Sequence, residues 1–106
     1  MGKRLTKIAT RTGDDGTTGL GDGSRVRKDN LRVAAMGDVD ELNSTIGMLA
    51  TEALPEPIAT LLTAIQHDLF DLGGELCIPG YENLPPAAVL RLDEALASFN
   101  ANLPRL

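Results

Sequence analysis

The chain has 106 residues, of which 42% are hydrophobic and 24% charged, and its formal net charge at pH 7 is −5. This length predicts a single domain with enough apolar residues for a globular core, and no apolar run approaches the roughly 20 residues of a membrane helix. The only cysteine, Cys77, excludes an internal disulfide. The basic N-terminus lacks the apolar stretch of a secretory signal, so the expected location is cytoplasmic.

Charge is divided unevenly along the chain. Residues 1–32 hold eight Lys or Arg and four Asp, a net charge of +4, whereas residues 33–106 have a net charge of −9. An acidic body argues against nucleic-acid binding, and a basic segment in front of it suits a small anionic ligand. We therefore expect neither nucleic acid nor membrane among the partners.

A glycine-rich loop is expected from about residue 10 to residue 30, after a flexible start (1–7) and a short extended piece (8–10). Five of the eleven glycines lie between Gly13 and Gly23. Glycine allows close backbone approach to a ligand, successive N–H groups can form an anion-binding nest, and threonine hydroxyls add donors. This predicts polyphosphate binding together with a divalent metal. A solvated turn is the competing interpretation, because neither a Walker A loop nor a dinucleotide fingerprint occurs.

Three helices are predicted after this loop. Asp38 and Glu41 have the spacing of a capping box, which places the start of the first helix near residue 39, while the apolar run 31–36 is a candidate beginning of the helical body. Apolar residues at steps of three and four then predict the helices Val39–Ala53, Pro57–Leu76 and Ala87–Asn100. Each has more than one apolar face, so other subunits or further chain must cover them.

The second predicted helix contains unusual residues. Gly73 and Gly74 cost about 1 kcal/mol each relative to alanine, so close approach of another helix or of a flat ligand is expected there. Phe70 and Cys77 are expected to be core residues. The lone His67 has no other ligand residues at metal-binding spacing, so we expect it to be structural or exposed.

Several motifs in this chain resemble the PduO-type ATP:cob(I)alamin adenosyltransferases. They are Thr-Arg-Thr-Gly-Asp-Asp-Gly-Thr-Thr from residue 10, Arg-Val-Arg-Lys-Asp from residue 25 and Gly-Asp-Val-Asp-Glu-Leu-Asn-Ser from residue 37. The stretches 65–76 and 91–93 fit as well, so the resemblance covers nearly the whole chain from residue 8 onward.

The resemblance implies a set of site residues. The implied ATP-binding residues are Thr10, Arg11, Thr12, Gly13, Asp14, Gly16, Thr17, Thr18 and Lys28. It also implies that Asp40 pairs with an arginine of a neighbouring subunit near the corrinoid, with Asn43 in the same motif. Solvated surface charge is the alternative for Lys28, and a first-turn carboxylate favoured by the helix dipole is the alternative for Asp40. No metal ligand is assigned, although Mg²⁺ is expected with ATP.

The same resemblance implies the fold and the activity. The family is all-α, a ferritin-like five-helix bundle that assembles as a homotrimer with active sites between subunits. Residues 1–106 would form one domain, with a nucleotide-binding loop segment (1–30) and three of the five helices (31–106), and without the C-terminal helices. The implied reaction transfers the 5′-deoxyadenosyl group from ATP to cob(I)alamin and releases triphosphate. The alternative is a catalytically inactive helical oligomerisation or ATP-binding module.

Overall fold

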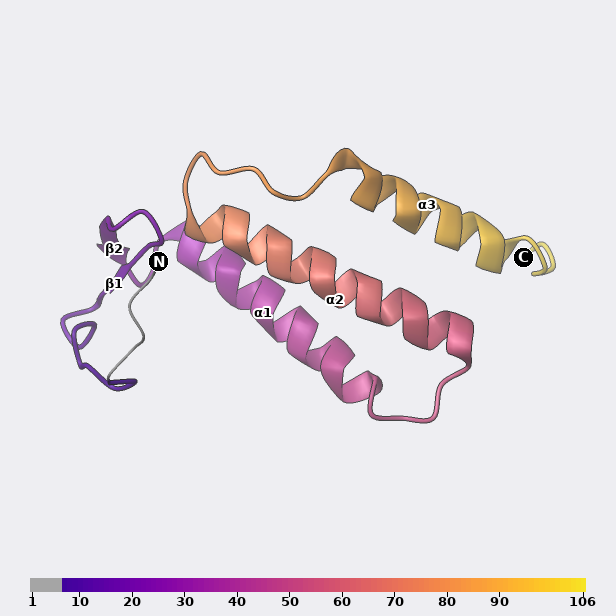
Figure 1. The fold of residues 1–106 in the computed structure, drawn as a ribbon, viewed down its shortest axis with the longest axis horizontal. Helices are drawn as coiled ribbons and strands as arrows, with labels where there is room; N and C mark the ends of the chain where they lie inside the picture. Colours follow the sequence, from indigo (N-terminus) through magenta and orange to yellow (C-terminus); the bar gives the residue numbers. More distant parts are fainter. Residues whose placement is uncertain (1–6) are drawn as a thin grey trace.

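The structure, a computed structural model, describes residues 7–106 and contains a small strand pair followed by three helices (Figure 1). The elements are β1 (Thr17–Gly19), β2 (Arg25–Arg27), α1 (Leu31–Leu49), α2 (Glu56–Cys77) and α3 (Pro86–Asn100). The three predicted helices are confirmed, whereas the strand pair inside the glycine-rich loop was not predicted. Most of the predicted flexible start lies outside the described residues.

The two strands form an antiparallel ribbon in which Thr18 pairs with Val26. Two similar tripeptides shape it, Asp15-Gly16-Thr17 before β1 and Asp22-Gly23-Ser24 before β2. In each, the aspartate Oδ1 accepts hydrogen bonds from the backbone N–H and the hydroxyl two residues later, at 2.6–3.0 Å. The middle glycines have φ of 88° and 86°, the left-handed region that glycine enters without steric cost. The ribbon therefore follows from a local Asp-Gly-Thr/Ser pattern.

Helix α1 begins eight residues earlier than predicted. Asn30 is the N-cap, and its side chain accepts a hydrogen bond from the N–H of Arg32 at 2.8 Å. Asp38 and Glu41 therefore lie inside the helix and form no capping box. The capping residue and the apolar run 31–36 together start the helix before the acidic pair is reached. The helix also ends at Leu49 instead of residue 53, before a connection that leads to Pro55, the N-cap of α2.

Replacing Asn30 with alanine should destabilise the protein by about 1 kcal/mol, because the N–H of Arg32 loses its side-chain acceptor. Asn30→Asp should retain most of the stability, since aspartate caps equally well. Chemical unfolding followed by circular dichroism measures both. A helix that unfolds at the same denaturant concentration in Asn30→Ala would contradict this start of α1.

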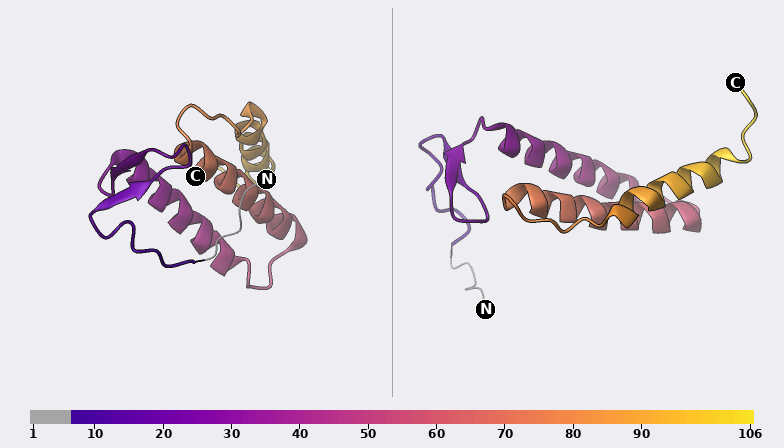
Figure 2. Two further views of the ribbon diagram at one scale, coloured as in Figure 1. Left: turned by 60° about the vertical axis from the view of Figure 1, so that its left-hand side comes forward. Right: turned by 90° about the horizontal axis from the view of Figure 1, so that it is seen from above.

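Helices α1 and α2 run antiparallel beside one another (Figures 1 and 2). The Nδ2 of Asn43 donates to the carbonyl of Gln66 at 3.3 Å, and the Nε2 of Gln66 donates to the carbonyl of Asn43 at 3.4 Å. A Cβ at Gly47 would lie 3.3 Å from that same Nε2, so a larger residue would press on the Gln66 side chain. These reciprocal bonds fix the register of the two helices.

Helix α3 is attached to α2 by two polar contacts. Arg91 forms an ion pair with Asp68 at 2.6 Å. Glu75 accepts hydrogen bonds from the N–H groups of Asn83 and Leu84 in the connection, and these bonds lower the pKa of its carboxyl group. The connection is thereby held against the C-terminal part of α2.

Little of this chain is buried. Among residues 7–106 only Leu20 and Ala88 are buried hydrophobics, and the predicted apolar line of α3 is exposed, with Leu96 69% accessible. The radius of gyration is 17.7 Å, above the roughly 13 Å of a compact 100-residue domain. As predicted, the helices carry apolar faces without cover. None of the described helices combines the length and apolar character needed to cross a membrane.

Candidate functional site

The loop from residue 10 to residue 18 closes against the residue that follows β2. The backbone N–H of Lys28 donates to the carbonyl of Gly16 at 2.9 Å. A Cβ built on Gly13 would lie 3.2 Å from the Lys28 Nζ and 2.9 Å from the carbonyl oxygen of Thr17. The lysine side chain thus packs over Gly13, where any larger residue would collide with backbone. The structure thus brings Gly13, Gly16 and Lys28 of the predicted ATP-binding set together.

Arg25 holds this loop in place. Its Nη2 donates to the carbonyl of Thr12 at 2.9 Å, to the carbonyl of Thr17 at 3.2 Å and to the Thr17 hydroxyl at 2.9 Å. Bonds from a guanidinium to carbonyl oxygens are stronger than neutral ones. Arg25 therefore ties the start of the loop to β1.

Arg27 and Lys28, the other basic residues next to the loop, differ in whether they form an ion pair. Arg27 is engaged with Asp29 in an exposed two-bond ion pair, with Nη2 to Oδ2 at 2.8 Å, which lowers the pKa of the Asp29 carboxyl. The only other ion pair within residues 7–106 is that of α3 with α2. The ammonium of Lys28 is consequently available to a ligand anion.

The other predicted loop residues lie at the surface. The hydroxyls of Thr10 and Thr12 are 3.0 Å apart, Arg11 has a φ of 60°, and Asp14 is exposed. Thr17 and Thr18 form the start of β1. Within the described part of the chain, no group of three or more His, Cys, Asp or Glu side chains could hold a metal ion. The loop thus presents hydroxyls, backbone and one free ammonium rather than a metal cage.

Asp15 gives this loop a testable pH dependence. Hydrogen bonds from the hydroxyl and the N–H of Thr17 lower the pKa of its carboxyl below the ordinary 3.8. A carboxyl group whose pKa is lower in the folded than in the unfolded protein stabilises the fold at pH values above the unfolded-state pKa. This stabilisation is lost as the pH falls through the folded-state pKa. The difference in unfolding free energy between the parent and Asp15→Ala should therefore be constant from pH 5 to 8 and shrink below 3.8. Asp15→Asn, which cannot titrate, should show no such change against Asp15→Ala.

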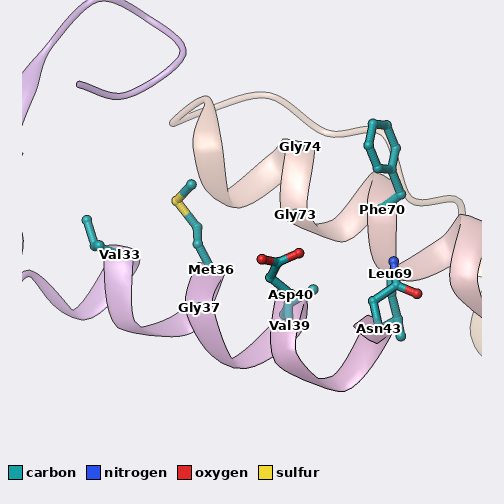
Figure 3. Close-up of a pocket in the computed structure, with 10 residues that line it drawn as sticks. All are labelled: Val33, Met36, Gly37, Val39, Asp40, Asn43, Leu69, Phe70, Gly73 and Gly74. Atoms are coloured by element: carbon teal, nitrogen blue, oxygen red, sulfur yellow. The ribbon is translucent and has the colours of Figure 1, made fainter. Parts of the chain in front are cut away.

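A separate apolar groove of about 450 Å³ lies between α1 and α2 (Figure 3). Helix α1 contributes Val33, Met36, Gly37, Val39, Asp40 and Asn43, and α2 contributes Leu69, Phe70, Gly73 and Gly74. Apart from Asn43, just past the middle of α1, these residues come from the N-terminal half of α1 and the C-terminal half of α2. The ribbon lies beyond the same end of this helix pair (Figure 1). The predicted loop set and the groove set are therefore two sites at one end of the molecule.

Asp40 is the only ionisable residue lining the groove, and its carboxylate extends from α1 toward the face of α2 (Figure 3). Asn43 uses its amide nitrogen to bind α2, while its Oδ1 is buried without a hydrogen-bond partner. The structure thus brings Asp40 and Asn43 to one wall. It places both apart from the glycine-rich loop.

The two glycines of α2 line open space. A Cβ on Gly73 or Gly74 would meet nothing within 4 Å among the described residues, so no helix of residues 7–106 approaches them. Both expected compensations, a flat ligand and a helix from outside these residues, remain predictions. Phe70, expected in the core, is 77% exposed and lines the groove. Cys77 is half-buried rather than buried, and His67 is exposed.

Sequence reasoning missed the roles of some of these residues and missed others altogether. The bonds of Arg25 and Asp15 within the loop could have been found from the Asp-Gly-Thr pattern and from the alternation Arg-Val-Arg, which is typical of a short strand. Met36 and Val33 were missed because the helix was expected to start after them. Arg32 could not be found from a local pattern, because the carbonyl that it binds, that of Leu76, is 44 residues away in the chain.

The comparisons with known proteins agree with this geometry. The family model of cobalamin adenosyltransferases matches residues 8–106. A cobalamin adenosyltransferase of Cupriavidus metallidurans is 67% identical over the whole chain, and a corrinoid adenosyltransferase of Bacillus subtilis is 43% identical over 94% of it. The chain spans 58% and 55% of the lengths of these two relatives.

Solved structures give the same result. A variant PduO-type ATP:corrinoid adenosyltransferase from Lactobacillus reuteri, complexed with cobalamin and ATP, superposes with a TM-score of 0.84 at 30% identity. The match covers 94% of this chain and 60% of that protein. A second variant of the same enzyme, complexed with ATP, superposes with a TM-score of 0.82.

Proposed function

The chain belongs to the cobalamin adenosyltransferase family, and from this we propose that its protein transfers the 5′-deoxyadenosyl group of ATP to cob(I)alamin. The observation that carries the proposal is the placement of an anion-suited loop and an apolar groove at one end of the α1–α2 pair. The relatives that bind ATP and cobalamin support the choice of ligands.

The proposed chemistry needs few protein groups. Co(I) is the nucleophile; it attacks C5′ of ATP, the cobalt–carbon bond forms, and the C5′–O bond breaks with its electron pair leaving on triphosphate. The protein must therefore orient two substrates and stabilise the leaving group. No acid–base residue is required for this displacement, which fits a groove whose only ionisable lining residue is Asp40.

The loop is suited to the triphosphate. The ammonium of Lys28 lies over Gly13 without an ion-pair partner in the described chain. An ammonium held next to a developing negative charge stabilises it most when it is already in place before the reaction. Mg²⁺ would enter as part of MgATP, held by phosphate oxygens and water rather than by a protein cage.

The groove is suited to the flat face of a corrinoid. Gly73 and Gly74 leave the surface of α2 open, and the walls are mostly apolar. An apolar, water-poor surrounding protects a reduced cobalt centre from solvent and strengthens electrostatic contacts during the transfer. We assign Asp40 and Asn43 to the wall nearest this substrate.

We also propose that the protein is a cytoplasmic homotrimer whose subunits cover one another's apolar faces. Large exposed side chains on each helix, such as Met48, Phe70 and Leu96, support an assembly of this kind. Light scattering of the purified protein should give three times the subunit mass. A monomer at micromolar concentration would overturn this part of the proposal.

The transfer itself is tested by mixing the protein with ATP and cob(I)alamin without oxygen. We expect adenosylcobalamin, followed by its absorbance, and one triphosphate for each molecule formed. Cobalamin kept in the Co(III) state is the matched control and should give no product, since it is not a nucleophile. Binding of MgATP without transfer would instead support an inactive nucleotide-binding module.

A further inference from the structure

The ribbon that carries the loop touches helix α2 at a single hydrogen bond. The N–H of Gly21, in the turn between β1 and β2, donates to the carbonyl of Cys77 at 2.8 Å. In the described chain this is the only hydrogen bond between residues 7–29 and α2. The adjacent Leu20 is one of the two buried hydrophobic residues of the described range 7–106, so this turn is also where the ribbon is best packed.

The contact leaves no room for a side chain at residue 21. A Cβ on Gly21 would lie 2.6 Å from Ile78 Cγ1, 3.1 Å from Cys77 Sγ and 3.3 Å from the Cys77 carbonyl oxygen. Gly21 has an ordinary φ, so glycine is required here by close approach and not by backbone conformation. A larger residue must displace the Ile78 side chain or move the ribbon away from the end of α2.

Arg32, in the first turn of α1, also binds the C-terminal end of α2. Its half-buried guanidinium donates from Nη1 to the carbonyl of Leu76 at 3.0 Å. Helix α2 has no basic residue in its own last turn, so Arg32 supplies the positive charge that a helix C-terminus favours. One side chain therefore joins the start of α1 to the end of α2, one residue before the carbonyl that the N–H of Gly21 binds.

We propose that Gly21 and Arg32 are positioning residues for the transfer, because this joint sets where the nucleotide loop lies relative to the groove. The inference rests on the proposed function. Gly73 and Gly74 in the groove wall lie two to four residues before Leu76 and Cys77, so the joint connects the loop to that wall through a rigid helix end. A displacement of about 1 Å between reacting groups can reduce the rate roughly 100-fold.

The proposal predicts that variants of the joint lose catalytic rate but keep their affinity for each substrate. Gly21→Ala should lower kcat by roughly 10- to 100-fold while the Kd for MgATP and the Kd for cobalamin, each measured alone, change less than about twofold. Ile78→Ala removes the closest obstructing atom, so the double variant Gly21→Ala/Ile78→Ala should recover much of the lost kcat. Gly19→Ala is the matched control, since a Cβ there meets only Arg25 Nη1 at an ordinary 3.5 Å.

Arg32 is tested in parallel in the full protein. Arg32→Met, which keeps the stem and removes the charge, should lower kcat with unchanged Kd values, and Arg32→Lys should recover part of the loss. Circular dichroism and thermal midpoints show that each variant is folded.

Three results would overturn the inference. Full kcat in Gly21→Ala would remove the positioning role and leave the proposed function intact. A parallel loss of MgATP affinity would make the joint part of the binding loop instead. A parent protein that forms no adenosylcobalamin would refute the proposed function and this inference with it.

Discussion

Replacing Lys28 with alanine should weaken MgATP binding by about 10- to 100-fold and leave the helices folded. A hydrogen bond from a charged donor contributes about 1.5–3 kcal/mol, which corresponds to this range of Kd. The backbone bond from Lys28 to Gly16 does not involve the side chain, so the ribbon should persist. Calorimetric titration with MgATP gives the affinity, and circular dichroism gives the fold.

The controls for this prediction separate charge from geometry. Lys28→Arg keeps the charge and should retain more affinity than alanine. Lys7→Ala removes an exposed lysine outside the loop and should change nothing. Equal affinity for MgATP in the parent and in Lys28→Ala would remove Lys28 from the proposed binding set.

Filling the groove at Gly73 should abolish cobalamin binding while stabilising the helix. Glycine inside a helix costs about 1 kcal/mol relative to alanine, and a Cβ at Gly73 meets no atom within 4 Å. Gly73→Ala should therefore raise the thermal midpoint, and Gly73→Phe should occupy the space expected to hold the corrinoid. Absorbance titration with cobalamin and thermal unfolding measure the two opposite effects.

Affinity for MgATP serves as the internal control in these variants, because the loop lies outside the groove. It should remain within about twofold of the parent in Gly73→Phe. Unchanged cobalamin binding in a folded Gly73→Phe protein would show that the corrinoid lies elsewhere.

The helices could be predicted from the sequence because their signals are local. The seam at steps of three and four and the prolines at 55, 57, 85 and 86 gave the bounds of α2 and α3 within a residue. The start of α1 was wrong because two capping signals compete, Asn30 and the pair Asp38–Glu41. The apolar run after Asn30 decides in favour of the earlier one.

For the candidate site, too, only the features with a local sequence signal could be predicted. The phosphate-suited loop could be predicted from its glycines, threonines and basic residues, because they are adjacent in sequence. The groove and the joint could not, because they depend on which residues of α1 and of the ribbon contact α2. The pairs Gly21–Cys77 and Arg32–Leu76 are 56 and 44 residues apart in the chain, and no local sequence pattern predicts such contacts.

The most direct test of the two-site account is an NMR titration of protein labelled with ¹⁵N at glycine only. MgATP should shift the amide signals of Gly13 and Gly16 in the loop. Cobalamin should shift those of Gly37, Gly73 and Gly74 around the groove. If MgATP instead moves the groove glycines and leaves Gly13 and Gly16 unchanged, the loop is not the nucleotide site and the account is wrong.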